Sequence, residues 1–574
     1  YRAVAQLVGR GTEGEDAVVA VRPTVSYNRL KEAGRFATNV NLPERQQTVH
    51  ATIAWSYALL PELERALFRR LGVFRGGWSL EAAEAICADL FPLDALDGLS
   101  SLVEQSLLVV RDEGGEPRFG MLETIREYAL EQLEAHDEGE ALRQQHTRFF
   151  LEFVESAEPE LTGAQQAFWM VALEAEHDNL RAALRWSLAH APEGALRLSG
   201  ALWRFWYGHT HLSEGRAWLE AAIARRDAIK ASSAPYLAKA LHGAGVLSMY
   251  QNDMAAAHVF LEEAQAIQRE QGDSGQLAFV LHDLGGLAQC EAEYGQATAL
   301  YEESLRLFRA VQNQWGIGVN LYRLGTVALA HNDVTRGEAL LQGSLPIFRD
   351  LSDHGSMAAV MVSLGELAEA HEEYRRAADY AQAGLALYQE VGNKHGVSWA
   401  LSVLGDVAEL EGDSRRARSY YEEGVALARE AGSTLSIAAE RGQLGCLAYD
   451  AGDYEHALAF AREELALVQN IGRKQTIIAC LEAVAAAASG QGRATYAACV
   501  CGAMEGLRES IGNPRASTER VRYERGIARA RRHSDEAVWA EAWAKGRAMS
   551  MAQAIAYALD PDAMIATSDG VPPT

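Results

Sequence analysis

Four carboxylates recur at matching places in the second half of this chain, and together they could bind a cation. Glu366 and Glu369 are three positions apart, and Asp406 and Glu409 repeat this spacing 40 residues later. Residues three apart on a helix lie on one face, so each pair would present its two carboxylates together. Two such pairs on neighbouring helices would make an acidic site for a basic peptide, an amine or a cationic part of another domain. The alternative is a solvated face, because charged residues are usually exposed.

Equivalent positions earlier in the chain hold histidine, aromatic and neutral polar side chains. With the four carboxylates they form our candidate ligand groove: His242, His282, Gln289, Tyr322, Glu366, Glu369, Asp406 and Glu409. Two histidines without a third ligand do not predict a metal site. Cys499 and Cys501 would diverge by about 200° on a helix, which also disfavours a shared metal. No Ser-His-Asp or HExxH arrangement occurs at usable spacing, so we expect no catalytic residue, no metal and no cofactor within this chain.

These positions take their register from a repeat of 40 residues within 241–513. A glycine marks each repeat: Gly245, Gly285, Gly325, Gly365, Gly405 and Gly445. Twelve residues after each glycine stands a small residue: Ala257, Ala297, Gly337, Ala377, Ala417 and Ala457. An unbroken period of this size predicts an array of helical repeats.

Each repeat is predicted to be a pair of helices. Apolar residues return six positions apart, as at Leu281 and Leu287, and give the first helix one apolar face. The glycine would cost this helix about 1 kcal/mol relative to alanine, so we interpret it as a close-packing position, with the small residue where the second helix crosses. Turns are expected at Asn252-Asp253 within a pair and at Ser352-Asp353 and Gly392-Asn393 between pairs. Positions three before, one after and four after the glycine are expected to face inward.

The combination of Leu-Gly, a bulky residue at the turn (Tyr294, Tyr374, Tyr454) and the small residue resembles the tetratricopeptide repeat (TPR) in a long-helix version. Six units match clearly, a seventh has Ala485 in place of the glycine, and an eighth precedes the array at 198–223. The resemblance implies a right-handed α-solenoid over 236–515, in which the first helices line an inner binding surface.

Residues 1–40 stay unassigned. They contain Gly9-x-Gly11-x-x-Gly14, the formal pattern of a dinucleotide loop, but a valine-rich run ending at Pro23 follows where a helix should begin. A hairpin between two short strands is therefore the favoured interpretation. The first residue is Tyr rather than Met, which suggests that this segment is the remnant of a truncated upstream domain. No P-loop pattern occurs in the chain.

The segment 41–137 predicts a winged helix. Pro61 suits the first position of a helix, which the Phe74 to Gly77 stretch ends, and Ser79 begins the next helix. A third helix is expected at 94–106 and a fourth at 123–134. Between them, an apolar strand at 107–110 and a second strand at 118–122 would form the wing.

The wording of this segment resembles the winged-helix arm of bacterial STAND-type regulators, of the MalT, AfsR and LuxR-linked kind. The resemblance rests on LPERQQT, ATIAWSY, LFRRLGVFRGGWSLEAAEA, LVEQSLL and FGMLETIREYA. In that family a P-loop ATPase precedes the arm and a TPR sensor follows it, so ATP or ADP is implied only if an upstream ATPase exists. Met121-Leu122-Glu123 replaces the family's usual Met-His-Asp near the wing, and residues 176–181 resemble the family's hinge between arm and sensor.

Direct DNA binding is not expected from this winged helix. Its candidate recognition helix, 94–106, has three acids and no Lys or Arg, whereas a helix in the major groove brings basic and amide groups. The net charge of −25 also opposes attraction to phosphates. We therefore expect this domain to pack against protein.

The remaining segments are expected to close the array. Residues 138–235 are helical and rich in aromatics, and a capping layer is favoured over a ligand cage because large aromatics are usually core. Capping helices are expected over 516–560, and a disordered tail over 561–574. The basic stretch 514–532 is interpreted as a solvated helix face, with a phosphate-binding stripe as the alternative.

Composition limits the class of protein. No run of eighteen apolar residues and no signal peptide occur, and six cysteines without CxxC spacing are interpreted as buried thiols, so we expect a cytoplasmic protein without membrane contact. The leading hypothesis is a non-enzymatic signal-sensing and protein-interaction region of a bacterial transcriptional regulator. Its TPR groove would bind a protein, a peptide or a small inducer, and the winged helix would relay this to an ATPase module. The alternative is a stand-alone TPR adaptor.

Overall fold

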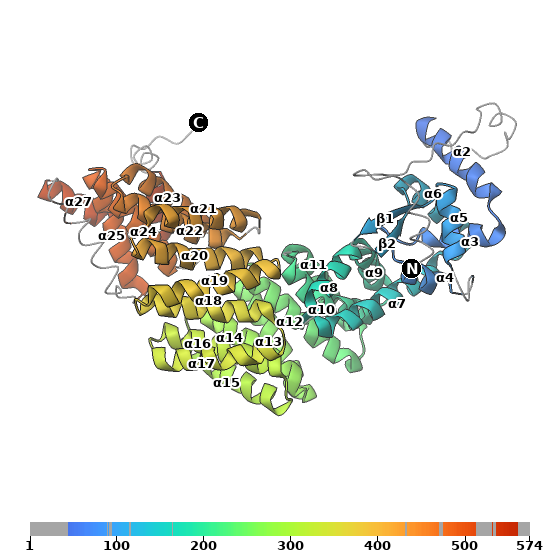
Figure 1. Cartoon of the computed structure of the whole chain (residues 1–574), viewed down its shortest axis with the longest axis horizontal. Helices are drawn as coiled ribbons and strands as arrows, with labels where there is room; N and C mark the ends of the chain where they lie inside the picture. Colours follow the sequence, from blue (N-terminus) through green and yellow to red (C-terminus); the bar gives the residue numbers. More distant parts are fainter. Residues whose placement is uncertain are drawn as a thin grey trace. The chain divides into compact units, whose positions relative to one another are not determined.

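The described chain is almost wholly helical and divides into two compact units (Figure 1). The first unit is 1–247 with 259–271, and the second is 248–258 with 272–574. In this computed structural model the described residues are 44–88, 90, 95–113, 116–162, 165–209, 211–430, 433–469, 474–511, 528, 531 and 535–560. The predictions for 1–40, for most of 514–532 and for 561–574 lie outside these residues and stay predictions.

The first unit begins with the winged helix. The two strands pair antiparallel, with Val109 opposite Gly120 and Val110 opposite Phe119. Phe68, Phe74 and Trp78 are at most 1% exposed and form its core. The winged-helix prediction is confirmed, and its elements are α2 (Glu44–Leu59), α3 (Glu62–Leu71), α4 (Leu80–Cys87), α5 (Leu96–Glu104), β1 (Val109–Glu113), β2 (Glu116–Gly120) and α6 (Glu123–Ala135).

The wing is shifted from the prediction: the first strand begins two residues later and ends three later, and the second begins and ends two residues earlier. Leu107 and Leu108 were expected in the first strand, but their backbone N–H groups both donate to the carbonyl of Leu102 and so close the end of α5. Ser106 makes this possible with a left-handed φ of 59°. The apolar pair is buried as a helix-end contact, and the strand begins only at Val109.

The helix starts of this domain follow from capping chemistry. Ser79 begins α4 as predicted, since its Oγ accepts a hydrogen bond from the backbone N–H of Ala82 at 3.2 Å. Pro61 lies one position earlier than predicted, immediately before α3, with an extended ψ of 156°. Its missing N–H is tolerated there for the same reason as at the first helical position.

A helical layer completes the first unit. Its aromatic residues are largely core, as the capping interpretation requires: Phe150 and Phe205 are 0% and Trp206 is 1% exposed. Phe168 on α8 is an exception at 61%. The helices are α7 (Gly139–Ala157), α8 (Gln166–Ala175), α9 (His177–His190), α10 (Pro192–Gly208), α11 (Leu212–Ile223), α12 (Ala234–Tyr250) and α13 (Met254–Gln271), with short 3-10 turns at Glu158–Thr162, Arg226–Ala228 and Ala231–Ser233.

The second unit is a solenoid of helical pairs, and the predicted fold class is confirmed. A helix of 17 residues and a turn of three fill half of the period, as in α18 and α19. The array consists of α14 (Ser274–Cys290), α15 (Tyr294–Ala310), α16 (Gln314–Ala330), α17 (Val334–Asp350), α18 (His354–Ala370), α19 (Tyr374–Glu390), α20 (Lys394–Leu410), α21 (Ser414–Glu430), α22 (Thr434–Asp450), α23 (Tyr454–Val468), α24 (Lys474–Gly490) and α25 (Ala494–Ile511).

The predicted turn residues end one helix and begin the next. Ser352 and Gly392 have left-handed φ angles of 54° and 68°. The residue that follows each of them caps the next helix: Asp353 Oδ1 accepts from the Ser356 N–H and Asn393 Oδ1 from the Gly396 N–H, both at 2.9 Å. The helix boundaries are therefore encoded locally.

The repeat glycines lie where two helices approach closely. A Cβ atom added at Gly405 would lie 2.4 Å from the ring of Tyr421, and one at Gly285 would lie 2.8 Å from the ring of Tyr301. A Cβ at Gly365 would lie 3.3 Å from the carbonyl oxygen of Ala377, the small residue twelve positions later. These small residues are buried at Ala257, Ala297, Ala377, Ala417 and Ala457.

Two further helices, α27 (Glu536–Arg547) and α28 (Met551–Leu559), close the array. The Tyr496 hydroxyl donates to the Ala558 carbonyl at 2.5 Å, and Arg462 Nε donates to the same oxygen at 2.9 Å. This contact holds α28 on α23 and α25.

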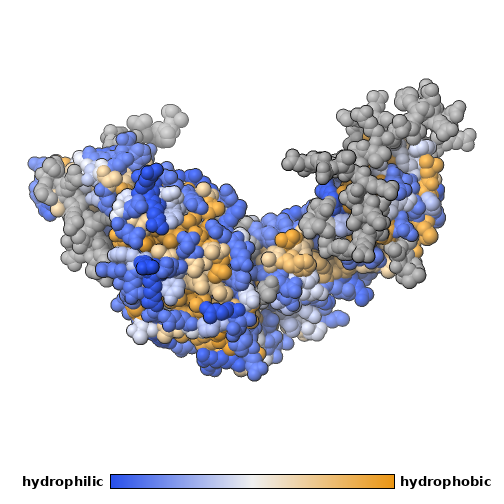
Figure 2. Space-filling view, in the orientation of Figure 1, coloured by the Kyte–Doolittle hydropathy of each residue, from blue (hydrophilic) through white to orange (hydrophobic). Residues whose placement is uncertain are grey.

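The surface of the described residues is mainly hydrophilic. Hydrophilic residues cover most of the face seen in Figure 2, with apolar patches among them. No helix among the described residues is long and apolar enough to cross a membrane. Four of the cysteines are buried as predicted, but Cys290 at the end of α14 is exposed and Cys446 is partly exposed, because both lie outside the apolar helix face.

Candidate functional site

Five carboxyl groups from three consecutive repeats lie near one another in the second unit: four belong to residues that are at least partly exposed, and the fifth is buried. Helix α18 supplies Glu366 and Glu369, α20 supplies Asp406 and Glu409, and α22 adds Glu440. The Glu369 carboxyl interacts electrostatically with those of Glu366, Asp406 and Glu409. The Glu440 carboxyl interacts with that of Asp406. We name these five residues the acidic face. The structure thus brings together the four carboxylates that the sequence predicted and adds one.

Hydrogen bonds from neighbouring helices fix the orientation of this face. The Tyr421 hydroxyl, from beneath on α21, donates to Asp406 Oδ1 at 2.6 Å, and Gln443 Nε2 donates to the same oxygen at 2.7 Å. Trp399 Nε1 donates to Glu366 Oε1 at 2.7 Å. Tyr421 is fully buried, so the Asp406 carboxyl is held against a rigid support.

Glu440 is the most buried member of the acidic face. Its side chain is 2% exposed, and Ser398 Oγ donates to its Oε1 at a long 3.4 Å. Its Oε2 atom is buried without a hydrogen-bond partner among the described residues. A buried carboxyl oxygen that lacks a partner is costly, so a ligand that supplied a donor would be favoured. A pocket of about 270 Å³ adjoins it, lined by His395, Ser398, Trp399, Ser402, Ser436, Ala439 and Glu440.

Four of the five carboxyl groups of the acidic face hold protons more tightly than usual. Burial, and then the charges of Asp406, Glu366 and Glu409, raise the pKa of Glu369 to about 7. Burial is also the main cause for Asp406, whose pKa is raised to about 6, and for Glu440, whose pKa is raised to about 8. Glu366 is exposed as a residue, but burial of its carboxyl group raises its pKa. The hydrogen bond from Trp399 acts in the opposite direction and is the smaller effect. A bound cation would relieve this strain by displacing the protons.

The neutral part of the predicted groove forms a hydrogen-bonded ladder in the second unit. The Tyr301 hydroxyl donates to Gln289 Oε1 at 3.0 Å, and Gln289 Nε2 donates to Thr326 Oγ1 at 3.3 Å. His282 Nδ1 pairs with Asn320 Oδ1 at 3.2 Å. All of these side chains are partly or fully buried, so this part is tightly packed.

The other two predicted residues have different surroundings. Tyr322 is partly exposed, and its hydroxyl lies 3.5 Å from Ser363 Oγ. His242 belongs to the first unit and is only 3% exposed, with its ring 5.3 Å from that of Trp203. The prediction that His242 lines an accessible surface is therefore wrong. The aromatic helical layer before the array covers it.

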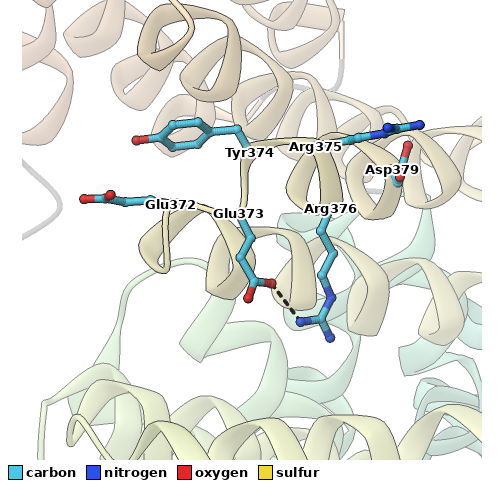
Figure 3. A pocket seen from close by; sticks show the side chains of 6 residues that line it. All are labelled: Glu372, Glu373, Tyr374, Arg375, Arg376 and Asp379. Atoms are coloured by element: carbon cyan, nitrogen blue, oxygen red, sulfur yellow. Dashed lines mark hydrogen bonds and ion pairs between the residues drawn. The ribbon is translucent and has the colours of Figure 1, made fainter.

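A separate hollow lies at the turn between α18 and α19 (Figure 3). Arg376 there is paired with Glu373 at 2.8 Å and with Glu338 at 3.1 Å. The Arg376 charge is thus matched within the array. The hollow is open and is lined by Glu372, Glu373, Tyr374, Arg375, Arg376 and Asp379. These features describe a solvated turn and not a binding site.

Glu440 was missed because it lies five positions before Gly445, outside the register assigned to inward residues. The sequence does contain a signal for Glu440: it is charged, whereas the equivalent positions of other repeats hold residues such as Ala400 and Val360. Ala400 and Val360 are fully buried and apolar, and the buried Asn320 at the same position has hydrogen-bond partners, so an acid there had to be either paired or functional.

Sequence comparisons connect the chain with mycobacterial proteins. A family model for a winged helix-turn-helix domain matches residues 60–134. A Mycobacterium tuberculosis (strain H37Rv) protein named "Putative HTH-type transcriptional regulator" is 38% identical over 244 residues, which are 41% of this chain and 27% of that protein. An uncharacterized protein of the same strain is 37% identical over 118 residues, 20% of this chain and 30% of its own. The chain thus spans less than a third of either relative.

Solved structures with similar helical arrangements are more distant. One is a STAND protein with a tetratricopeptide repeat sensor from Pyrococcus horikoshii, with a TM-score of 0.48 and 14% identity over 87% of this chain and 67% of that one. Another is a Rap protein complexed with competence and sporulation factor, with a TM-score of 0.47 and 14% identity over 68% of this chain and 99% of that one.

Proposed function

We propose that this chain is a non-enzymatic, signal-receiving region of a bacterial transcriptional regulator, and that its acidic face binds a cationic segment of a protein or peptide. The observation that carries the proposal is the gathering of five neighbouring carboxyl groups from α18, α20 and α22, among which the buried Glu440 Oε2 has no hydrogen-bond donor in the described part of the chain. The names of the mycobacterial relatives support the regulator class.

The chemistry of the acidic face favours a guanidinium or ammonium group. Burial and neighbouring carboxyl groups raise the pKa values of the acidic face, whereas hydrogen bonds from hydroxyl groups and from an indole lower them. An arginine side chain would offer two parallel donors to a carboxylate and would supply the missing positive charge. A small inducer with an amine could use the same chemistry, since the pocket beside Glu440 is close to the lower size of small-molecule sites.

The winged helix is proposed to relay the signal through protein contacts. Three of its arginines are paired with glutamates: Arg69 and Arg70 pair with Glu138 at 2.9 and 3.1 Å, and Arg118 pairs with Glu176 at 2.6 Å. The described part of α5 exposes Asp97 and Glu104, which would repel phosphates. The STAND resemblance then suggests an ATPase module, with ATP or ADP, as the receiver of the signal.

The proposed binding can be tested on the full chain with an array of random 12-residue peptides. We expect bound peptides to be enriched in Arg and Lys. In the double variant Glu366→Lys/Glu409→Lys, the affinity of a selected peptide measured by fluorescence anisotropy should fall by more than about tenfold, because attraction becomes repulsion. Affinity should also fall with decreasing pH between about 8 and 5, as the carboxyls take up protons.

The matched control is Glu422→Lys/Glu423→Lys, which makes the same change in net charge on two exposed residues of α21. This variant should bind the peptide within about twofold of the parent, because salt screens exposed charges that lie away from the binding site. Equal losses in both double variants, or none in the first, would remove the acidic face as the binding site.

A further inference from the structure

We infer that Glu174, His177 and His211 form a metal site for Zn²⁺ in the first unit, with His209 as the fourth ligand. Glu174 is the penultimate residue of α8 and His177 begins α9, while His209 directly follows α10 and His211 directly precedes α11. The site is independent of the acidic face and lies in a different unit.

The distances around Glu174 carry the inference. Its Oε2 atom lies 3.1 Å from His211 Nε2, 3.8 Å from His177 Nδ1 and 3.8 Å from His209 Nδ1. The ligand atoms of Glu174, His177 and His211 are all within 4.8 Å of one another. In a tetrahedral zinc site with bonds of about 2.0–2.1 Å, ligand atoms are about 3.3 Å apart. Small side-chain rotations would therefore bring these atoms to coordination distance.

A buried, unsatisfied nitrogen is the second observation. The His177 side chain is 8% exposed, and its Nε2 atom has no hydrogen-bond partner among the described residues. That nitrogen lies 3.7 Å from Glu214 Oε1. A metal on Nδ1 would keep the proton on Nε2, where it faces the Glu214 carboxylate, which is the usual carboxylate-histidine-metal arrangement.

The Glu214 carboxylate is itself held in place. Arg181 donates to both of its oxygens at 2.6 Å, and Trp218 Nε1 donates to Oε1 at 3.1 Å. These three hydrogen bonds fix the position of the carboxylate beside His177. Such an outer partner orients the histidine and raises its basicity toward a metal.

The ligand set selects the kind of ion. Imidazole nitrogens with one carboxylate suit Zn²⁺, and also Ni²⁺ or Cu²⁺, whereas Mg²⁺ and Ca²⁺ require oxygen ligands. With His209 the protein would supply four ligands, and a closed four-ligand site is structural rather than catalytic.

The location gives the metal a mechanical consequence. Glu176 and Asn179, beside His177, contact the winged helix: Arg118 pairs with Glu176 at 2.6 Å, and Asn179 Nδ2 donates to the Gly77 carbonyl at 2.8 Å. A metal at His177 would fix the start of α9 to the turn between α10 and α11. It would thereby stiffen the segment that holds the winged helix.

The test uses the tag-free full chain, stripped of metal by chelator and dialysis. Zn²⁺ titrated by calorimetry should bind with one equivalent at a dissociation constant below about 1 μM, and the melting temperature should rise with Zn²⁺ by ligand linkage. Co²⁺ in place of Zn²⁺ should give visible absorption bands of a tetrahedral site. Absence of a stoichiometric site in the parent chain would overturn the inference.

The variants assign the ligands. His177→Ala and His211→Ala should each weaken binding by more than about 100-fold, while Glu214→Gln should weaken it by about 10–100-fold. His190→Ala, which removes an exposed histidine of the same helix α9, is the matched control and should bind like the parent. Because the buried His177 variant could unfold, Glu174→Gln at a 43% exposed side chain provides a second ligand change, checked by circular dichroism. Unchanged affinity in Glu174→Gln and His211→Ala would place the metal elsewhere.

Discussion

At the scale of single residues, the buried Glu440 carboxyl makes stability depend on pH. Its pKa is about 8 in the folded chain and about 4.3 when unfolded, so the folded state holds more protons between these values. Stability contributed by this group is present at low pH and is lost as pH rises toward 8. Glu369 and Asp406, with pKa values of about 7 and 6, act in the same direction.

We therefore expect the melting temperature of the parent chain to fall between about pH 5 and pH 8. Glu440→Gln keeps the shape of the side chain but cannot ionise. The free energy of unfolding of this variant should therefore decrease over the same pH range by roughly 1–3 kcal/mol less than that of the parent. Thermal melts followed by circular dichroism over this range would measure it. Glu422→Gln, exposed on α21, is the control and should follow the parent. A parallel fall in Glu440→Gln would contradict the assignment.

At the scale of the helical pair, glycine spacing decides how closely two helices pack. A Cβ at Gly405 would lie 2.4 Å from the ring of the buried Tyr421, whereas a Cβ at Gly343 on α17 would meet nothing within 4 Å. Gly405→Ala should destabilise by about 1–3 kcal/mol through overpacking. Gly343→Ala should stabilise by up to about 1 kcal/mol through helix propensity. Opposite shifts in melting temperature are expected, and shifts of one sign in both would show that packing does not set the glycine period.

The helices of the array could be predicted because their signals are local. Asp353 and Asn393 cap helices through bonds to residues three positions ahead, and the residues before them turn the chain. The wing could not be placed to the residue in the same way. Leu107 and Leu108 have the composition of a strand, but their N–H groups were already used by the Leu102 carbonyl. Only the geometry of the α5 end, with Ser106 at positive φ, reveals this.

At the scale of the whole molecule, the repeat period carried information that single positions lack. It brought residues 40 apart into neighbouring places, so Glu366 and Asp406 could be predicted to share a surface. The 40-residue period does not relate the residues of the histidine cluster to one another. Glu174 and His211 are 37 positions apart on different helices, and nothing in their spacing announces that they meet. The acidic face was thus largely predictable, whereas the histidine cluster needed the structure.

In the first unit, the buried side-chain amide of Asn179 connects α9 to residues more than 100 positions earlier in the chain. Asn179 is fully buried; its Nδ2 donates to the Gly77 carbonyl at 2.8 Å, and its Oδ1 accepts from the Arg75 N–H at 2.7 Å. Asn179→Ala would leave both backbone groups without this partner, at about 1–3 kcal/mol each. We expect faster amide hydrogen exchange in residues 73–78 and at the start of α9, with exchange in α18–α22 unchanged. His190→Ala should leave both regions as in the parent. Unchanged exchange at 73–78 after the loss of Asn179 would show that its hydrogen bonds do not hold this stretch against α9.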